Sequence, residues 1–231
     1  MPDFDPERSS TSDVVWRAII PQSRCGDQGK ALAEVLETQR LDRPPRMVTH
    51  HWANNFRDLT AAVLADALGL KRWDGIAEKL TAGDTEELVQ QLWTRGSLHW
   101  QYWICAACIN QHASICNNFM GARDSVTGEL MPSCDCKTPK RFSDQPILCE
   151  VNKFDEMMGF LHRSYKRDFL QVVAIDKGFN MFSRAWCVAE LVEADSNNLE
   201  QHVILHSPQV LENNADRLCS LQVQDCEASN P

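Results

Sequence analysis

The sequence lacks any uninterrupted apolar run near the roughly 18 residues that a membrane-spanning helix needs. Its first residues, MPDFDPERSSTSD, are acidic and polar, and they lack the basic start and apolar centre of a secretory signal. No internal repeat is visible, so a repeat architecture is not expected. These absences predict a cytoplasmic protein without a membrane partner.

An excess of positive charge is also missing. The 231 residues include 23 Lys and Arg against 32 Asp and Glu, for a formal net charge of −9. An acidic surface repels phosphate backbones, so nucleic acid is not expected as a partner. With 43% hydrophobic and 24% charged residues, the composition is that of a globular protein large enough to bury a core.

Cysteine, by contrast, is abundant, with ten residues. In a small secreted protein they would indicate a disulfide framework. Several of them, however, lie inside apolar runs, as do Cys105, Cys108 and Cys187. Free cysteine packs as a small hydrophobic residue, so buried thiols are the favoured interpretation.

The chain divides into two predicted parts. Residues 1–45 read as an N-terminal extension that is partly disordered, above all over 1–14, with VVWRAII (14–20) as a strand or a short helix. Residues 46–231 read as an α/β domain with a Cys-containing loop insertion at about 117–150, which is rich in Gly, Pro, Ser and Asp and has no sustained period.

Strand-like and helix-like segments alternate in the second part. The predicted strands are 46–50, Tyr102–Cys108, Leu170–Asp176, 202–207 and a last edge strand within 221–229. The predicted helices are 56–69, a segment that starts with a capping box of Asp84 and Glu87 and ends at Gly96, 152–165, 183–194 and 211–221. This alternation predicts a mostly parallel sheet with helices on both faces.

Three segments resemble a known superfamily. RMVTHHWANNFRDLTAAVLADAL and VVAIDKGFNMFSRAWCVAELVEA resemble parts of Toll/interleukin-receptor (TIR) domains, with W-C-x-x-E-L at Trp186–Leu191, although the step from Ser183 to Trp186 is one residue longer than usual. YWICAACINQH resembles a motif of the TIR-like fungal heterokaryon-incompatibility (HET) domains, with Cys105 in place of its Asp. CDC…PK…CEVNKFDEMM resembles an uncharacterised protist family that implies no activity. The resemblance implies a flavodoxin-like, TIR-like fold.

It also implies an activity. Many TIR domains hydrolyse NAD+ at the nicotinamide–ribose bond in defence or stress signalling, and the glutamate of the motif, here Glu190, is catalytic. In open α/β sheets ligands bind beyond the carboxyl ends of the strands. The residues that the resemblance and this rule place near a nucleotide are His51, Trp52, Asp176, Phe179, Ser183 and Trp186. Helical spacing puts Trp186, Glu190 and Glu193 on one face, with Val192 among the residues on the opposite, sheet-facing side.

Other interpretations remain open. A glutamate on a helix is usually a solvated surface residue, and His50 and His51 can be structural. Asn110 and Gln111 fit a strand end as well as a ligand contact. TIR-like domains also act as self-associating homo-oligomeric scaffolds, and a nucleotide can be sensed without turnover. No cofactor is required in any of these cases.

Structural zinc is a further possibility. The spacing Cys105-x2-Cys108-x3-His112-x3-Cys116 has suitable ligand types, but a strand would point its first two cysteines to opposite faces. Cys134, Cys136 and Cys149 in the insertion form the better candidate, with His162 as a fourth ligand.

Overall fold

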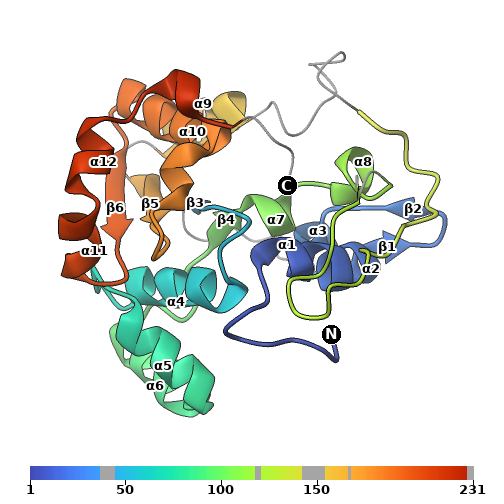
Figure 1. The fold of residues 1–231 in the computed structure, drawn as a ribbon, viewed down its shortest axis with the longest axis horizontal. Coiled ribbons are helices and arrows are strands. Elements are labelled where there is room, and N and C mark those ends of the chain that lie inside the picture. The colour runs from blue at the N-terminus through green and yellow to red at the C-terminus, as the bar shows by residue number, and fades with distance from the viewer. Residues whose placement is uncertain (37–44, 118–120, 142–153, 166–167, 228–231) are drawn as a thin grey trace.

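A four-stranded parallel sheet stands at the centre of the computed structural model, which describes residues 1–36, 45–117, 121–141, 154–165 and 168–227 (Figure 1). Its strands are β3 (Arg46–Thr49), β4 (Tyr102–Ile104), β5 (Leu170–Ala174) and β6 (Glu200–Ile204), in the order β4-β3-β5-β6. Each neighbouring pair is parallel. This confirms the predicted α/β fold with a mostly parallel sheet.

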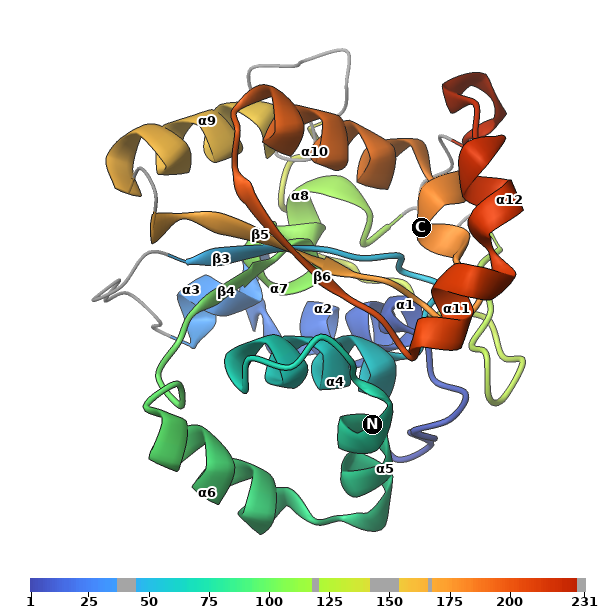
Figure 2. The ribbon, with the colours of Figure 1, turned by 90° about the vertical axis from the view of Figure 1, so that its left-hand side faces the viewer.

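Helices cover both faces of the sheet, as predicted. Figure 2 shows α9 (Phe154–Tyr165) and α10 (Ala185–Ser196) on one face and α4 (Phe56–Ala67) on the other. Successive side chains of a strand point to opposite faces. In β3, Met47 accordingly joins Met158 in the core beneath α9 and α10, whereas Val48 joins Leu59 in the core beneath α4. All five residues of β5 are buried, so this strand occupies the middle of the sheet.

Two helices on the α4 side, α4 and α6 (Thr85–Arg95), begin and end near the predicted residues, whereas α5 (Asp74–Ala82) between them was not predicted. Asn55 stands at the N-cap of α4, and Gly96 ends α6 in the left-handed conformation, with φ 74°. The predicted capping box is wrong, because Asp84 makes no side-chain capping bond and the Glu87 carboxylate instead accepts hydrogen bonds from Lys79 and Gln91. Helix α5 connects α4 to α6.

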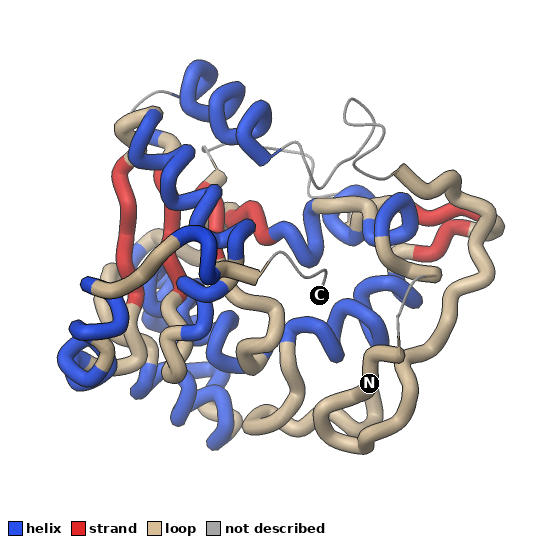
Figure 3. Tube along the Cα trace, turned by 45° about the horizontal axis from the view of Figure 1, so that its top comes forward, coloured by secondary structure: helices blue, strands red, loops and turns tan. Residues whose placement is uncertain are grey.

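The N-terminal segment packs on the rest of the chain. It contains α1 (Thr11–Val14), a π-helical turn η1 (Val15–Ile19), α2 (Ile20–Gln22), the hairpin β1 (Arg24–Cys25) and β2 (Gln28–Gly29), and α3 (Leu32–Val35). VVWRAII is thus helical, one of its two predicted states. Val15 and Trp16 are buried with Trp52 and Ile115, and Ser9–Thr11 are buried within the stretch predicted as disordered. Figures 1 and 3 show this segment beside the sheet, next to residues 121–141.

Several predicted boundaries are wrong. The strand predicted over Tyr102–Cys108 ends at Ile104, where its pairing with β3 ends, and the chain turns into α7 (Cys105–Cys108) and α8 (Gln111–Ser114). In place of a helix over 211–221 there are two short ones, α11 (Pro208–Asn213) and α12 (Ala215–Cys219). The described residues also form the 3-10 turns η4 (Asn180–Ser183) and η5 (Val223–Asp225). The turn η5 lies within the segment predicted as a last edge strand, of which residues 228–229 lie outside the described residues.

The insertion has little regular structure where it is described. Residues 121–141 contain one isolated bridge, between Arg123 and Leu130, and no helix or strand. The rest of the predicted insertion up to residue 150 lies outside the described residues. None of the helices in the described ranges combines the length and the apolar character needed to cross a membrane.

A buried carboxylate connects α4 to the sheet. The side chain of Asp66 is 1% exposed and accepts hydrogen bonds from Arg46 Nη1 at 2.9 Å and Tyr102 Oη at 2.7 Å. His202 Nδ1 lies 2.6 Å from its other oxygen. These partners come from β3, β4 and β6, so one side chain of α4 holds three of the four strands. Burial and the bond to Asp66 together raise the pKa of the Tyr102 hydroxyl.

We expect Asp66→Ala to lower the free energy of unfolding by about 3 kcal/mol, because it leaves Arg46 unpaired in a largely buried place. Urea unfolding at neutral pH measures this. Asp84→Ala is the matched control: Asp84 makes no capping bond, and its replacement should change the free energy of unfolding by less than about 0.5 kcal/mol. Equal stability of the two variants would contradict the role given to Asp66.

Candidate functional site

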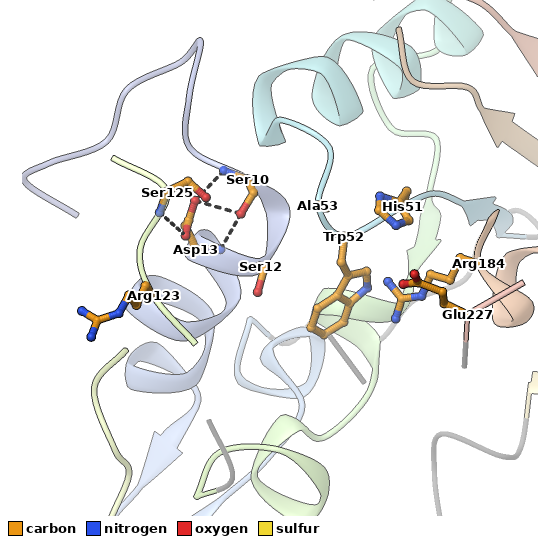
Figure 4. Close-up of a pocket in the computed structure, with 10 residues that line it drawn as sticks. All are labelled: Ser10, Ser12, Asp13, His51, Trp52, Ala53, Arg123, Ser125, Arg184 and Glu227. Carbon is orange, nitrogen blue, oxygen red and sulfur yellow. Dashed lines mark hydrogen bonds between the residues drawn. The ribbon is translucent and has the colours of Figure 1, made fainter. Parts of the chain in front are cut away.

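A cavity of about 350 Å³ opens at the carboxyl end of β3, which is followed by His50, His51 and Trp52 (Figure 4). We call it the strand-end cavity. It is lined by Ser10, Ser12, Asp13, His51, Trp52, Ala53, Arg123, Ser125, Arg184 and Glu227. Two of the predicted site residues, His51 and Trp52, therefore line a cavity at the predicted edge of the sheet. Its remaining wall comes from Ala53, from Arg184 at the N-cap of α10, and from residues of the N-terminal segment, the insertion and the C-terminal region, which sequence reasoning did not include.

The two site residues predicted after β5, Asp176 and Phe179, stabilise the loop that follows the strand. The Asp176 carboxylate accepts hydrogen bonds from the backbone N–H groups of Asn180 and Met181, at 3.0 and 2.8 Å. Phe179 is fully buried in the left-handed conformation, with φ 59°. Neither residue lines the strand-end cavity. They fix the path of the loop into α10.

The two residues predicted at the start of α10 also lie outside the lining. Arg184 occupies the N-cap of α10, and the Ser183 hydroxyl, before it, donates to the Asn180 carbonyl at 2.7 Å. Trp186 is partly buried in the first turn of α10. The structure thus brings His51 and Trp52 to the cavity and leaves Ser183 and Trp186 beside it.

Glu190 lies between α10 and the sheet, not on the side of the helix expected from spacing. The Thr49 hydroxyl donates to Glu190 Oε2 at 2.6 Å, and Gln171 Nε2 donates to Thr49 Oγ1 at 2.7 Å. Val192, expected on the sheet side, is 58% exposed. Sequence reasoning missed one signal for the rotation of α10, which is that Thr49 and Gln171 are polar residues in buried strands. Such residues require hydrogen-bond partners, and the helix packed against them supplies one in Glu190.

The environment of Glu190 changes its acidity. Burial raises the pKa of its carboxyl group from 4.5 to about 7, although the hydrogen bond from Thr49 and the charge of Arg184 oppose this rise. The carboxyl group is therefore partly protonated at neutral pH. Strongly shifted pKa values are concentrated at functional sites, and this one lies at the ligand-binding edge of an α/β sheet.

Two buried polar atoms near the cavity have no partner among the described residues. His50 is 4% exposed, and burial lowers its pKa to about 4, so the ring is neutral at pH 7. Its Nδ1 lies 3.4 Å from the Val48 carbonyl, whereas its Nε2 lacks a hydrogen bond, as does Nε of Arg184. The charge of Arg184 also lowers the pKa of His50, which indicates that the two groups are neighbours. A buried donor and acceptor of this kind point to a ligand or an ordered water.

The thiols near Glu190 are weak acids. Burial raises the pKa of Cys105 to about 12, and burial likewise raises the pKa of Cys187. Trp52 Nε1 donates to Cys105 Sγ at 3.2 Å, and Cys187 Sγ donates to the His50 carbonyl at 3.3 Å. Since the thiolate is the nucleophilic form, neither cysteine supplies a nucleophile at neutral pH.

A second group of side chains could hold a metal ion. The ligand atoms of His112, Cys116, Cys134 and Cys136, which we call the His/Cys cluster, all lie within 4.8 Å of one another. Cys134 and Cys136 were predicted for such a site, whereas Cys149 lies outside the described residues. The cluster does not contain His162. Its other two ligands are His112 and Cys116, the second half of the Cys105–Cys116 motif. The objection to that motif assumed a strand, whereas β4 ends at Ile104 and the chain then turns into helix. The missed signal was His-x3-Cys, a spacing that a helical turn brings together.

Comparison with known proteins adds no relative: no family model, no curated protein and no solved structure matches the chain. The resemblance to TIR and HET domains therefore rests on the motifs alone.

Glu190→Gln should change how stability depends on pH. The folded protein retains a proton on Glu190 up to about pH 7, whereas the unfolded chain releases it near 4.5. The stability of the wild type should therefore fall as pH rises through this window, and that of the glutamine variant should lack this term. Relative to the wild type, the variant should gain on the order of 2 kcal/mol between pH 5 and pH 8.

Urea unfolding at several pH values measures this difference. The exposed Glu212 provides the control, and Glu212→Gln should follow the wild-type pH profile. A constant difference between Glu190→Gln and the wild type across the window would rule out the raised pKa.

Proposed function

We propose that the protein binds NAD+ or a closely related nucleotide in the strand-end cavity and cleaves its nicotinamide–ribose bond with the help of Glu190. The observation that carries the proposal is the inward-facing Glu190, whose carboxylate accepts from Thr49 at the carboxyl end of β3 and lies near Arg184, which together with Trp52 lines the cavity. The W-C-x-x-E-L resemblance supports the same role.

The chemistry suits a carboxyl group in this place. Cleavage of the glycosidic bond passes through an oxocarbenium-like state, and a nearby carboxylate stabilises the positive charge that develops on the ribose. Nicotinamide leaves as a neutral base, so no strong general acid is needed, and a water molecule then bonds to the ribose carbon and releases a proton to solvent. The hydrogen bond from Thr49 favours the ionised form of Glu190 and holds it in one orientation.

The lining of the cavity offers groups that suit a nucleotide. Trp52 provides a ring for stacking on a base, and Arg184 provides a cation for a phosphate. Arg123 points away from Trp52 and donates to the Gly128 carbonyl at 2.8 Å (Figure 4). Asp13 is engaged already, since its carboxylate accepts from Ser10 and from the Ser125 N–H. A volume of about 350 Å³ is at the low end for small-molecule sites, so the cavity suits one nucleoside half of a dinucleotide.

A sensor without turnover is the second candidate, and one observation favours it. Glu190 does not itself line the strand-end cavity, because its carboxylate turns toward Thr49. In this case the nucleotide would bind against Trp52 and Arg184 and leave unchanged.

Release of nicotinamide from NAD+ tests the first candidate. We expect turnover by the wild type at high protein concentration and a loss of at least about 100-fold in Glu190→Gln and Glu190→Ala, which remove a group that acts on the reacting bond. Asp195→Asn, an exposed change on the same helix, should retain wild-type activity. Equal activity of Glu190→Ala and the wild type would exclude Glu190 as the catalytic group.

The sensor gives a different result. NAD+ would raise the melting temperature of the wild type without product, and Arg184→Gln would abolish the shift. If NAD+ neither reacts nor changes the melting temperature, both candidates fail.

A further inference from the structure

We infer that the His/Cys cluster is a closed zinc site with a structural role, in which His112, Cys116, Cys134 and Cys136 are the four ligands. This site is separate from the strand-end cavity and does not depend on the proposed function.

The distances between the ligand atoms fit one tetrahedral ion. Cys116 Sγ lies 3.5 Å from Cys136 Sγ, and Cys134 Sγ lies 3.6 Å from His112 Nδ1. Zinc bonds of about 2.3 Å to sulfur and 2.0 Å to nitrogen separate the ligands by roughly 3.5 to 3.8 Å. The widest pair lies within 4.8 Å, about 1 Å beyond this range.

His112 is oriented as a metal ligand. Its Nε2 lies 3.1 Å from Ser23 Oγ, whose own proton is donated to the Ile19 carbonyl at 2.7 Å. Ser23 therefore accepts from Nε2–H, and the lone pair of Nδ1 points toward the cysteines. A bound histidine commonly fixes its other nitrogen in this way. The ring itself is fully buried against the hairpin, and a Cβ on Gly29 would lie only 2.0 Å from its Cγ.

Two cations face the sulfur atoms. Lys140 Nζ lies 2.8 Å from Cys116 Sγ, and Arg24 Nη1 lies 3.5 Å from Cys134 Sγ. Three thiolates and one Zn²⁺ leave a net charge of −1, which the charge of Lys140 balances, whereas the charge of Arg24 is balanced by Asp135. Both cations also have oxygen partners, since Lys140 Nζ donates to the His112 carbonyl and Arg24 Nη1 pairs with Asp135.

The alternatives for the same residues fit less well. A disulfide needs its sulfur atoms about 2.05 Å apart and has no use for the oriented histidine. A catalytic zinc retains an open coordination position, whereas here four protein side chains surround the centre and three of them are buried. A closed set of this kind is typical of a structural metal.

The site also has a structural task in the fold. Residues 121–141 have almost no regular secondary structure, yet they carry two of the ligands. The other two ligands come from α8 and its end, and Ser23 and Gly29 bring the N-terminal segment to His112. A metal there would hold this loop to α8 and would add to the packing of Met131 in the neighbouring core.

The zinc content of the purified protein tests the inference. We expect about one zinc per wild-type chain and at least a tenfold loss in Cys116→Ser and Cys136→Ser. Cys219→Ser, at an exposed cysteine outside the cluster, should retain the wild-type content. Zinc loss in Cys219→Ser equal to that in Cys116→Ser, or no zinc in wild type purified with zinc under reducing conditions, would overturn the site.

A measurement on the wild type alone covers the case in which a ligand variant fails to fold. Replacement of the metal by Co²⁺ should produce thiolate-to-cobalt charge-transfer absorption and the visible bands of a tetrahedral ion. Chelation should lower the melting temperature, and Zn²⁺ but not Mg²⁺ should restore it. An octahedral cobalt spectrum, or a Cys116–Cys136 disulfide found by mass spectrometry of the native protein, would contradict the proposal.

Discussion

The architecture depends on one buried carboxylate. Asp66 sits on the inner side of α4 and takes partners from β3, β4 and β6, so it fixes the helix against three strands at once. A carboxylate at 1% exposure is costly unless each oxygen is paired, and here each one is. The same contact holds Arg46 at the start of β3, the strand whose last residue, Thr49, donates to Glu190.

Much of this fold was predictable because burial leaves a periodic trace in the sequence. The run Leu170–Ala174 is apolar apart from Gln171 and identifies a strand covered on both faces. The helix over Phe56–Ala67 shows its apolar positions at helical spacing, and Gly96 marks a helix end. The end of β4 was not predictable, because alanine and cysteine in Cys105–Cys108 pack equally well in a strand or a helix.

The candidate site was less accessible to sequence reasoning. The strand-end rule located His51 and Trp52, since it depends only on chain direction in a parallel sheet. It could not place Asp13, Arg123 or Glu227, which come from segments far away in the sequence and meet the cavity only through tertiary packing. The rotation of α10 was likewise hidden, because apolar periodicity favours Val192 as the inward residue and carries no information about Thr49.

The residues that line the strand-end cavity come from both ends of the sequence as well as from the sheet region, so the cavity is larger than the sheet domain alone can form. Ser10, Ser12 and Asp13 belong to residues before the sheet, yet they form one side of the hollow above it. Near the other end of the chain, the Glu227 N–H donates to the Ser183 carbonyl at 2.7 Å and so brings Glu227 to the opposite side. A fragment that began at Arg46 and ended after β6 would preserve the central strands with that hollow open on two sides. The boundary of the sheet and the boundary of the recognition surface therefore do not coincide.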